Sequence, residues 1–265
     1  MELKFWKSEI EDRIALLTFD RPPNNAMTTD AVVEFKAALE KLDRNDDVMV
    51  LILAGKADNA FIAHADLTEI NDLINLADPG KIAETIEIWH NAFSMIETIS
   101  KPVIAAIHGL TLGGGAELCL ACDLRVMAED AYLGFPEVMA GLIPMAGGTQ
   151  RLPRLIGASK AKELILTAGM LSSAEALRLG LVAKVVARPD LLREATALAK
   201  YISDAAAPLA VRAAKQAVNR GLKASDPRQQ PIIETECALT LLNTDDLKEG
   251  VRAILEQRAP KFHGR

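Results

Sequence analysis

The segment from Lys101 to Asp123 constrains the fold more than any other part of the chain. Its residues 103–107 (VIAAI) are all apolar, too apolar for a strand with one face in water. Three consecutive glycines follow at Gly113–Gly115, and an apolar run with helical character then extends from Ala116 to Cys122. A buried strand that leads through glycines into a buried helix indicates an α/β protein with covered strands.

Strands and helices alternate through the first half of the chain. Short apolar runs predict strands at Ile14–Phe19, Val48–Leu53 and Leu124–Ala128. The periodicity of Thr29–Leu42 predicts a helix between the first two of them. The α/β class follows from this alternation.

The pattern changes after Gly147 and becomes mostly helical. Residues 172–175 form a capping box that begins a short helix, which Gly180 can close. A strand is predicted at Lys184–Ala187, and Pro189 is suited to the first turn of the next helix. We therefore predict a core at residues 1–200 and a helical region at 201–265.

The composition is that of a soluble globular protein, with 265 residues, 50% hydrophobic and 25% charged. No apolar run approaches the ~20 residues of a membrane span. The start, MELKFWKSEIEDR, lacks the apolar core of a secretory signal, so a cytoplasmic location is expected.

Charge and cysteine content exclude several classes of partner. The net charge is −6 and basic residues do not cluster, which argues against nucleic-acid binding. Cys119 and Cys122 form a CxxC inside the apolar helix, where buried thiols are the simpler interpretation. No second CxxC or histidine pair accompanies them, so no metal site is predicted.

The three glycines lie where a helix N-terminus offers backbone N–H groups that lack intrahelical partners. Neither phosphate-binding motif fits: the P-loop needs Gly-Lys-Ser/Thr, and the dinucleotide fingerprint needs glycine where Leu118 stands. A site for a developing oxyanion remains. Because alanine is the better helix former, Gly114→Ala is expected to fold with little loss.

Two glutamates stand alone among apolar residues. Glu117 lies three residues after Gly114 and therefore on the same helix face, and Glu137 is the only charged residue in 131–150. Burial raises the pKa of a carboxyl group towards that of a working acid or base, so the pair suggests acid–base chemistry. The alternative is tight packing at the glycines with Glu117 in a buried ion pair.

A third element is AFIAHADLTEI at residues 60–70. Asp66 and Glu69 have capping-box spacing, so a helix is predicted from Leu67, and Ala65 would keep a free N–H just before the cap. A plain turn between a strand and a helix is the alternative.

Taken together, these stretches resemble the crotonase superfamily of enoyl-CoA hydratases and isomerases. The matches occur in family order over most of the chain. They are DRPPNNAM (20–27), AFIAHADL (60–67), KPVIAAIHGLTLGGGAELCLACDLRV (101–126), FPEVMAGLIPMAGGTQRLPRLIG (135–157) and SSAEALRLGLV (172–182).

The resemblance implies a spiral of β-β-α units with a helical C-terminal region that supports a homotrimer or homohexamer. It also implies hydration of a trans-2-enoyl-CoA to a 3-hydroxyacyl-CoA, with Glu117 and Glu137 as catalytic residues. The N–H groups of Ala65 and Gly114 would form the oxyanion hole. Coenzyme A is part of the substrate, so no separate cofactor is implied. The substrate-binding residues would be Ala63, Asp66, Leu67, Leu112, Gly113, Pro136 and Met145.

Two positions depart from the family pattern. His64 and Met145 stand where glycine is usual, and Met145 is expected to reshape the acyl pocket. An anionic CoA also needs local cations on this acidic chain, and the candidates are Arg21, Lys56, Lys101 and Lys261.

Three other functions compete with hydration. An enoyl-CoA isomerase typically needs one carboxylate, whereas this chain keeps both. A glycosidase also uses paired carboxylates but has no need of a glycine-lined oxyanion site. A non-catalytic acyl-CoA-binding protein is the third, because a fold alone does not fix function.

Overall fold

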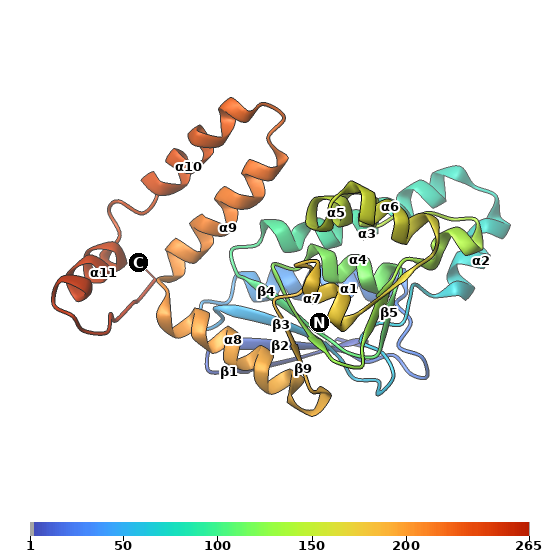
Figure 1. Cartoon of the computed structure of the whole chain (residues 1–265), viewed down its shortest axis with the longest axis horizontal. Helices are drawn as coiled ribbons and strands as arrows, with labels where there is room; N and C mark the ends of the chain where they lie inside the picture. The colour runs from blue at the N-terminus through green and yellow to red at the C-terminus, as the bar shows by residue number, and fades with distance from the viewer. Residues whose placement is uncertain (1–2, 265) are drawn as a thin grey trace.

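A computed structural model describes residues 3–264, and its centre is a six-stranded sheet (Figure 1). The strand order is β1-β2-β3-β4-β6-β9, in which β1 and β2 form an antiparallel hairpin and every later neighbour is parallel. The strands are β1 (Trp6–Glu11), β2 (Ile14–Phe19), β3 (Val50–Gly55), β4 (Val103–Ile107), β6 (Leu124–Ala128) and β9 (Lys184–Val186).

The predicted strands agree closely with this sheet. β2, β4 and β6 have the predicted bounds, and β9 ends one residue before its predicted end. The strand predicted at Val48–Leu53 instead begins at Val50, the first residue that pairs with β2 in register, and continues to Gly55. β1 was not predicted, since five of its six residues are exposed and give no alternating pattern.

A second, three-stranded sheet follows the order β5-β7-β8, from β5 (Leu110–Leu112), β7 (Tyr132–Gly134) and β8 (Met170–Ser172). β5 follows β4 after two residues, and β7 follows β6 after three. Each pair therefore runs from the large sheet to the small one and then into helices. This repetition is the spiral of β-β-α units that the resemblance implied.

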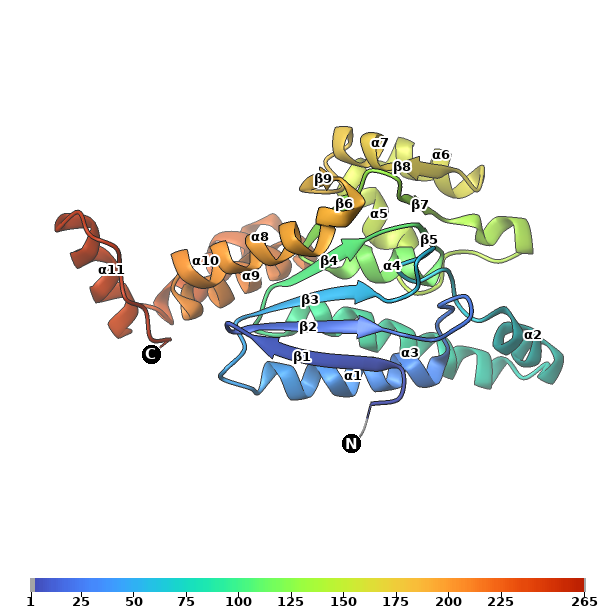
Figure 2. The same ribbon diagram turned by 90° about the horizontal axis from the view of Figure 1, so that it is seen from below.

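Helices cover both faces of the large sheet. Figure 1 shows α8 (Leu191–Ala205) along one face and α1 (Thr29–Asp43), α3 (Pro79–Thr98) and α4 (Gly114–Ala121) on the other, and Figure 2 shows α1 beside α3. All eight residues of α4 are buried, as expected for a helix that is apolar except for Glu117. The remaining elements before α8 are α2 (Leu67–Leu76), η1 (Pro136–Ala140), α5 (Gly148–Ile156), α6 (Ala158–Leu166), α7 (Ser173–Arg178) and η2 (Arg188–Asp190).

The predicted helix starts are mostly confirmed. The Ser172–Glu175 capping box begins α7, and Gly180 follows its end at φ 72°. Asp66 caps α2 as predicted, but the reciprocal half of that capping box is wrong: the Glu69 carboxylate accepts from the Thr29 N–H instead. Pro189 lies in η2, immediately before α8 rather than inside it.

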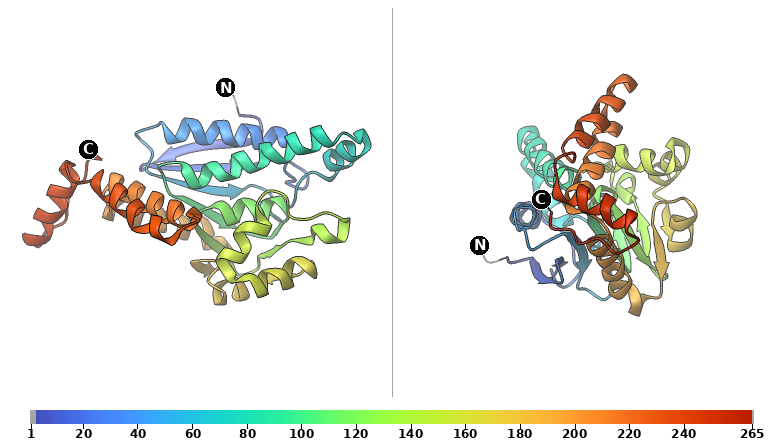
Figure 3. Two further views of the ribbon diagram at one scale, coloured as in Figure 1. Left: turned by 90° about the horizontal axis from the view of Figure 1, so that it is seen from above. Right: turned by 90° about the vertical axis from the view of Figure 1, so that its left-hand side faces the viewer.

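Helices α9 (Pro208–Lys223), α10 (Gln230–Leu239) and α11 (Asp245–Leu255), with the short η3 (Pro227–Gln229), extend away from the two sheets (Figure 3). This is the helical C-terminal region expected from the sequence. The predicted boundary after residue 200 falls within α8, and the division into two domains stays a prediction. Within residues 3–264, the helices include none of the length and apolarity needed to cross a membrane.

Candidate active site

The N-terminus of α4 opens onto an apolar cavity. Gly113 precedes the helix at φ 49°, a conformation that favours glycine, and Gly114 is the first helical residue. The N–H of Gly114 has no intrahelical acceptor, and none of the hydrogen bonds among the described residues uses it. Gly114 and Glu117 both line this cavity.

A second backbone donor comes from Ala65. A parallel bridge to Met27 engages its neighbours, because Met27 N–H donates to the His64 carbonyl and Asp66 N–H donates to the Met27 carbonyl. In such a bridge the central residue directs its own N–H away from the partner strand. Ala65 N–H therefore stays without an acceptor across residues 3–264, and Ala65 lines the same cavity.

Glu117 is held by the backbone rather than by a cation. Its Oε1 accepts hydrogen bonds from the N–H groups of Ala146 (2.8 Å) and Gly148 (2.7 Å), and the residue is 3% exposed. The buried ion pair of the packing interpretation is therefore wrong. Burial raises the pKa of Glu117 to about 7, the Gly148 hydrogen bond opposes that shift, and the charge of Glu137 adds to it.

Glu137 presents a carboxylate with no protein partner. It lies on η1, and neither of its two buried oxygens has a hydrogen-bond partner among the described residues. Burial raises its pKa as well. A buried carboxyl group without a partner costs folding free energy, so its place in the cavity calls for a chemical explanation.

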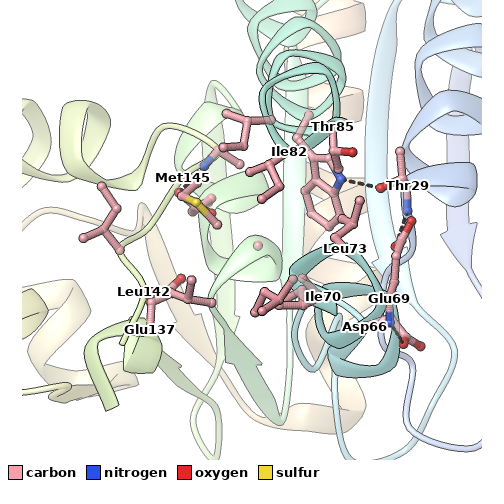
Figure 4. A pocket seen from close by; sticks show the side chains of 18 residues that line it. Thr29, Asp66, Glu69, Ile70, Leu73, Ile82, Thr85, Glu137, Leu142 and Met145 are labelled. Carbon is pink, nitrogen blue, oxygen red and sulfur yellow. Dashed lines mark hydrogen bonds between the residues drawn. The ribbon is translucent and has the colours of Figure 1, made fainter. Parts of the chain in front are cut away.

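The cavity itself has a volume of about 190 Å³ and mostly apolar walls. Figure 4 shows Ile70 and Leu73 of α2 and Ile82 of α3 on one side, with Leu142 and Met145 on the other. Trp89 of α3 also lines it, and its Nε1 donates to the Thr29 hydroxyl. Such a wall suits a hydrocarbon chain that ends at the polar groups of Ala65, Gly114 and the two glutamates.

The sequence analysis did not predict α3, whose residues form part of the cavity wall. Asp78 caps the helix and Pro79 occupies its first turn, and apolar residues follow at Ile82, Ile86, Trp89 and Phe93. That spacing is helical, so the helix itself was detectable. Its contact with the glycines was not, because it joins segments that are distant in the sequence.

The structure brings most of the proposed site residues together. Ala65, Asp66, Gly114, Glu117, Glu137 and Met145 line the cavity, whereas Ala63, Leu67, Leu112, Gly113 and Pro136 lie close to those residues in the chain but not on its wall. His64 is also off the wall, with its Nδ1 2.7 Å from the Ala65 carbonyl oxygen.

One expectation about Gly114 is wrong. A Cβ at this position would lie 2.6 Å from the Trp89 ring, so alanine requires the tryptophan to move and folding with little loss is no longer expected. The clash places this Cβ against Trp89, which lines the cavity.

Of the four candidate cations for CoA, one is excluded. The Lys101 ammonium is buried and donates to the carbonyls of Leu42 and Asn45. Arg21 pairs with Asp66 at 2.8 Å. Lys56 pairs with Asp20 at 2.8 Å, and Lys261 is exposed.

Glu117 should make the stability of the protein depend on pH. Its folded pKa of about 7 lies above the ordinary glutamate value of 4.5, so the folded state binds this proton more tightly and stability falls as pH rises from about 4.5 to 7. Glu117→Gln should therefore gain about 2 to 3 kcal/mol relative to wild type between pH 5 and pH 8. Urea unfolding of both proteins at the two pH values measures this; a constant difference would refute the raised pKa.

Comparisons with known proteins identify the family. A family model described as enoyl-CoA hydratase/isomerase matches residues 9–265. A short-chain-enoyl-CoA hydratase of Clostridium acetobutylicum is 37% identical over 260 residues, with 97% of each chain covered. A crotonyl-CoA hydratase of Syntrophomonas wolfei is 39% identical over 255 residues, with 96% of each covered.

Solved structures agree. The crystal structure of an enoyl-CoA hydratase from Bacillus anthracis superposes with a TM-score of 0.92 at 34% identity, covering 99% of this chain and 100% of that one. The chain belongs to the enoyl-CoA hydratase/isomerase family.

Proposed function

We propose that this protein is an enoyl-CoA hydratase that adds water reversibly to a trans-2-enoyl-CoA and forms a 3-hydroxyacyl-CoA. The observation that carries the proposal is the pair of buried carboxyl groups in one apolar cavity, Glu117 and Glu137, beside two unused backbone donors. The hydratases among its relatives support the same activity.

The proposed chemistry divides between the donors and the carboxyl groups. The N–H groups of Ala65 and Gly114 hold the thioester oxygen and stabilise the negative charge that develops there. Glu117 removes a proton from water as the water oxygen bonds to C3, and Glu137 gives a proton to C2. Glu117 gains one proton and Glu137 loses one, so the net charge of the pair does not change, and transfer of the proton from Glu117 to Glu137 restores the starting state.

The bond-shifting activity of an isomerase is the second candidate, because the family model covers both reactions. Isomerisation moves a proton between two carbons and needs no base for water. The hydrogen-bonded Glu117 beside the free Glu137 favours hydration, since each carboxyl group then has a task.

Assay of the purified protein against 2-enoyl-CoAs and 3-enoyl-CoAs of increasing chain length tests the proposal. We expect loss of the conjugated 2-enoyl thioester with formation of a 3-hydroxyacyl-CoA. Conversion of 3-enoyl-CoAs alone would instead assign the isomerase activity.

We also propose that the chain assembles as a homotrimer or homohexamer. Large apolar side chains stand exposed on the C-terminal helices, beyond what isolated surface residues require. They include Ile232 (58%), Leu239 (58%), Ile254 (78%) and Leu255 (79%), and Leu242 in the turn between α10 and α11 is 57% exposed. A cytoplasmic location stays a prediction from the sequence.

Sedimentation velocity at micromolar concentration tests the assembly. We expect a trimer or hexamer for the wild type, and a shift towards smaller species for Leu239→Glu, which places a charge on the exposed face of α10. The matched control is Lys36→Glu, which changes an exposed lysine of α1, outside the C-terminal helices. A monomeric wild type would contradict the proposed assembly.

A further inference from the structure

The side chain of Arg151 binds the loop at residues 146–148, whose N–H groups donate to Glu117. Arg151 lies on α5, and its Nη1 donates to the Ala146 carbonyl at 3.0 Å. The N–H groups of Ala146 and Gly148 are the two donors to Glu117. The guanidinium and the catalytic carboxylate therefore bind the same three-residue loop.

The backbone of this loop at Gly147 leaves space for the Arg151 guanidinium. Gly147 has φ 112°, and a Cβ there would lie 1.9 Å from Arg151 Nη1. The space that a side chain at 147 would fill is occupied by the arginine. The glycine and the arginine are thus complementary, and the sequence GGTQR (147–151) carries both.

Arg151 is itself fixed by contacts with α3, which α9 reinforces. Its Nε donates to Glu97 Oε1 at 2.6 Å and its Nη2 to the Ser94 hydroxyl at 3.2 Å, both on α3. Lys223 of α9 pairs with the other oxygen of Glu97 at 2.6 Å. Burial opposes the ionised form of Glu97, but Lys223 and Arg151 keep its pKa below the usual value, so the pair stays charged.

We propose that Arg151, oriented by Glu97, is a positioning residue that keeps the Ala146 and Gly148 N–H groups aimed at Glu117. It acts through the loop and through its charge, without touching the substrate. The inference rests on the proposed function for its effect on turnover. Its effect on Glu117 itself is independent of the reaction.

The charges around Glu117 determine in which direction its pKa should change when Arg151 is replaced. Two side-chain charges act on its pKa in opposite directions: Glu137 raises it and Arg151 lowers it. Removing the arginine should therefore raise the pKa of Glu117. Since Glu117 must be ionised to accept a proton from water, the acid limb of the rate profile should move to higher pH.

The test compares Arg151→Met, Arg151→Lys and Glu97→Gln with a matched control, Arg154→Met. Arg154 is an exposed arginine on the same helix. We expect Arg151→Met to lower kcat about 10- to 100-fold, the scale of a small misplacement, with KM changed less than about threefold. Arg151→Lys keeps the positive charge but not the several N–H donors of the guanidinium, so its kcat should lie between those of wild type and Arg151→Met. The control should have the kcat of wild type.

A titration without substrate separates this inference from the proposed function. The carboxyl ¹³C signal of Glu117, assigned by its loss in Glu117→Gln, should titrate at higher pH in Arg151→Met and at the wild-type value in Arg154→Met. A folded Arg151→Met with unchanged titration and kcat overturns the inference. If that variant fails to fold, the same readouts on Arg151→Lys and Glu97→Gln decide it. If the shift appears but wild type hydrates no enoyl-CoA, the positioning stands and the proposed function fails.

Discussion

Replacement of either carboxyl group should lower hydration by about 10²- to 10⁴-fold, the usual contribution of a positioned acid or base. The variants are Glu117→Gln and Glu137→Gln. In Glu117→Gln the new amide oxygen can still accept the Ala146 and Gly148 N–H groups, so the loop keeps its hydrogen bonds. The amide cannot take a proton from water, and turnover falls while the fold persists.

The control for this prediction is Glu87→Gln, an exposed glutamate on α3, which should turn over at the wild-type rate. Binding of free CoA should change little in all three variants, because neither cavity glutamate is proposed to contact it. Near-wild-type turnover in both cavity variants would refute the hydratase assignment.

The second large effect is expected at the oxyanion donors. Gly114→Ala should lose about 10²- to 10³-fold in turnover, the cost of removing one such donor, because the methyl group obstructs the N–H. It should also lose stability, since its Cβ meets the Trp89 ring at 2.6 Å. In Gly114→Ala alone, a loss of turnover could come from the obstructed N–H or from the packing clash with Trp89.

A double-mutant cycle separates them. Trp89→Leu removes the ring that the Cβ meets, so Gly114→Ala should cost much less stability in that background. Turnover per folded molecule should stay low, because the methyl group still lies beside the N–H. If the double variant regained the turnover of Trp89→Leu alone, the loss would be one of packing and the oxyanion role of Gly114 would be wrong.

The sequence predicted correctly those strands that consist of consecutive apolar residues. β2, β4 and β6 are short apolar runs with clear ends, and their bounds matched. The strands β5, β7 and β8 have only three residues each, too few for a periodic pattern, and unlike the equally short β9 they were not predicted. Their pairing is set by tertiary contact, which the sequence does not display.

The same distinction holds in the site. Glu117 and Glu137 were detectable because a lone carboxylate in an apolar segment is conspicuous. Lys101 looked like a surface cation, but its ammonium is buried against two carbonyls of the α1 end and the following turn. The roles of Trp89 and Arg151 depend on helix packing across long sequence separations, and neither has a local signature.

Isotopic labelling of the reaction tests the central claim most directly. A 2-enoyl-CoA is incubated with the enzyme in H₂¹⁸O and, separately, in D₂O, and the product is analysed by mass spectrometry and NMR. Hydration by the two glutamates predicts one ¹⁸O in a hydroxyl group at C3 and one deuterium at C2 of a 3-hydroxyacyl-CoA. A product without ¹⁸O, in which only the double bond has moved, would contradict the account.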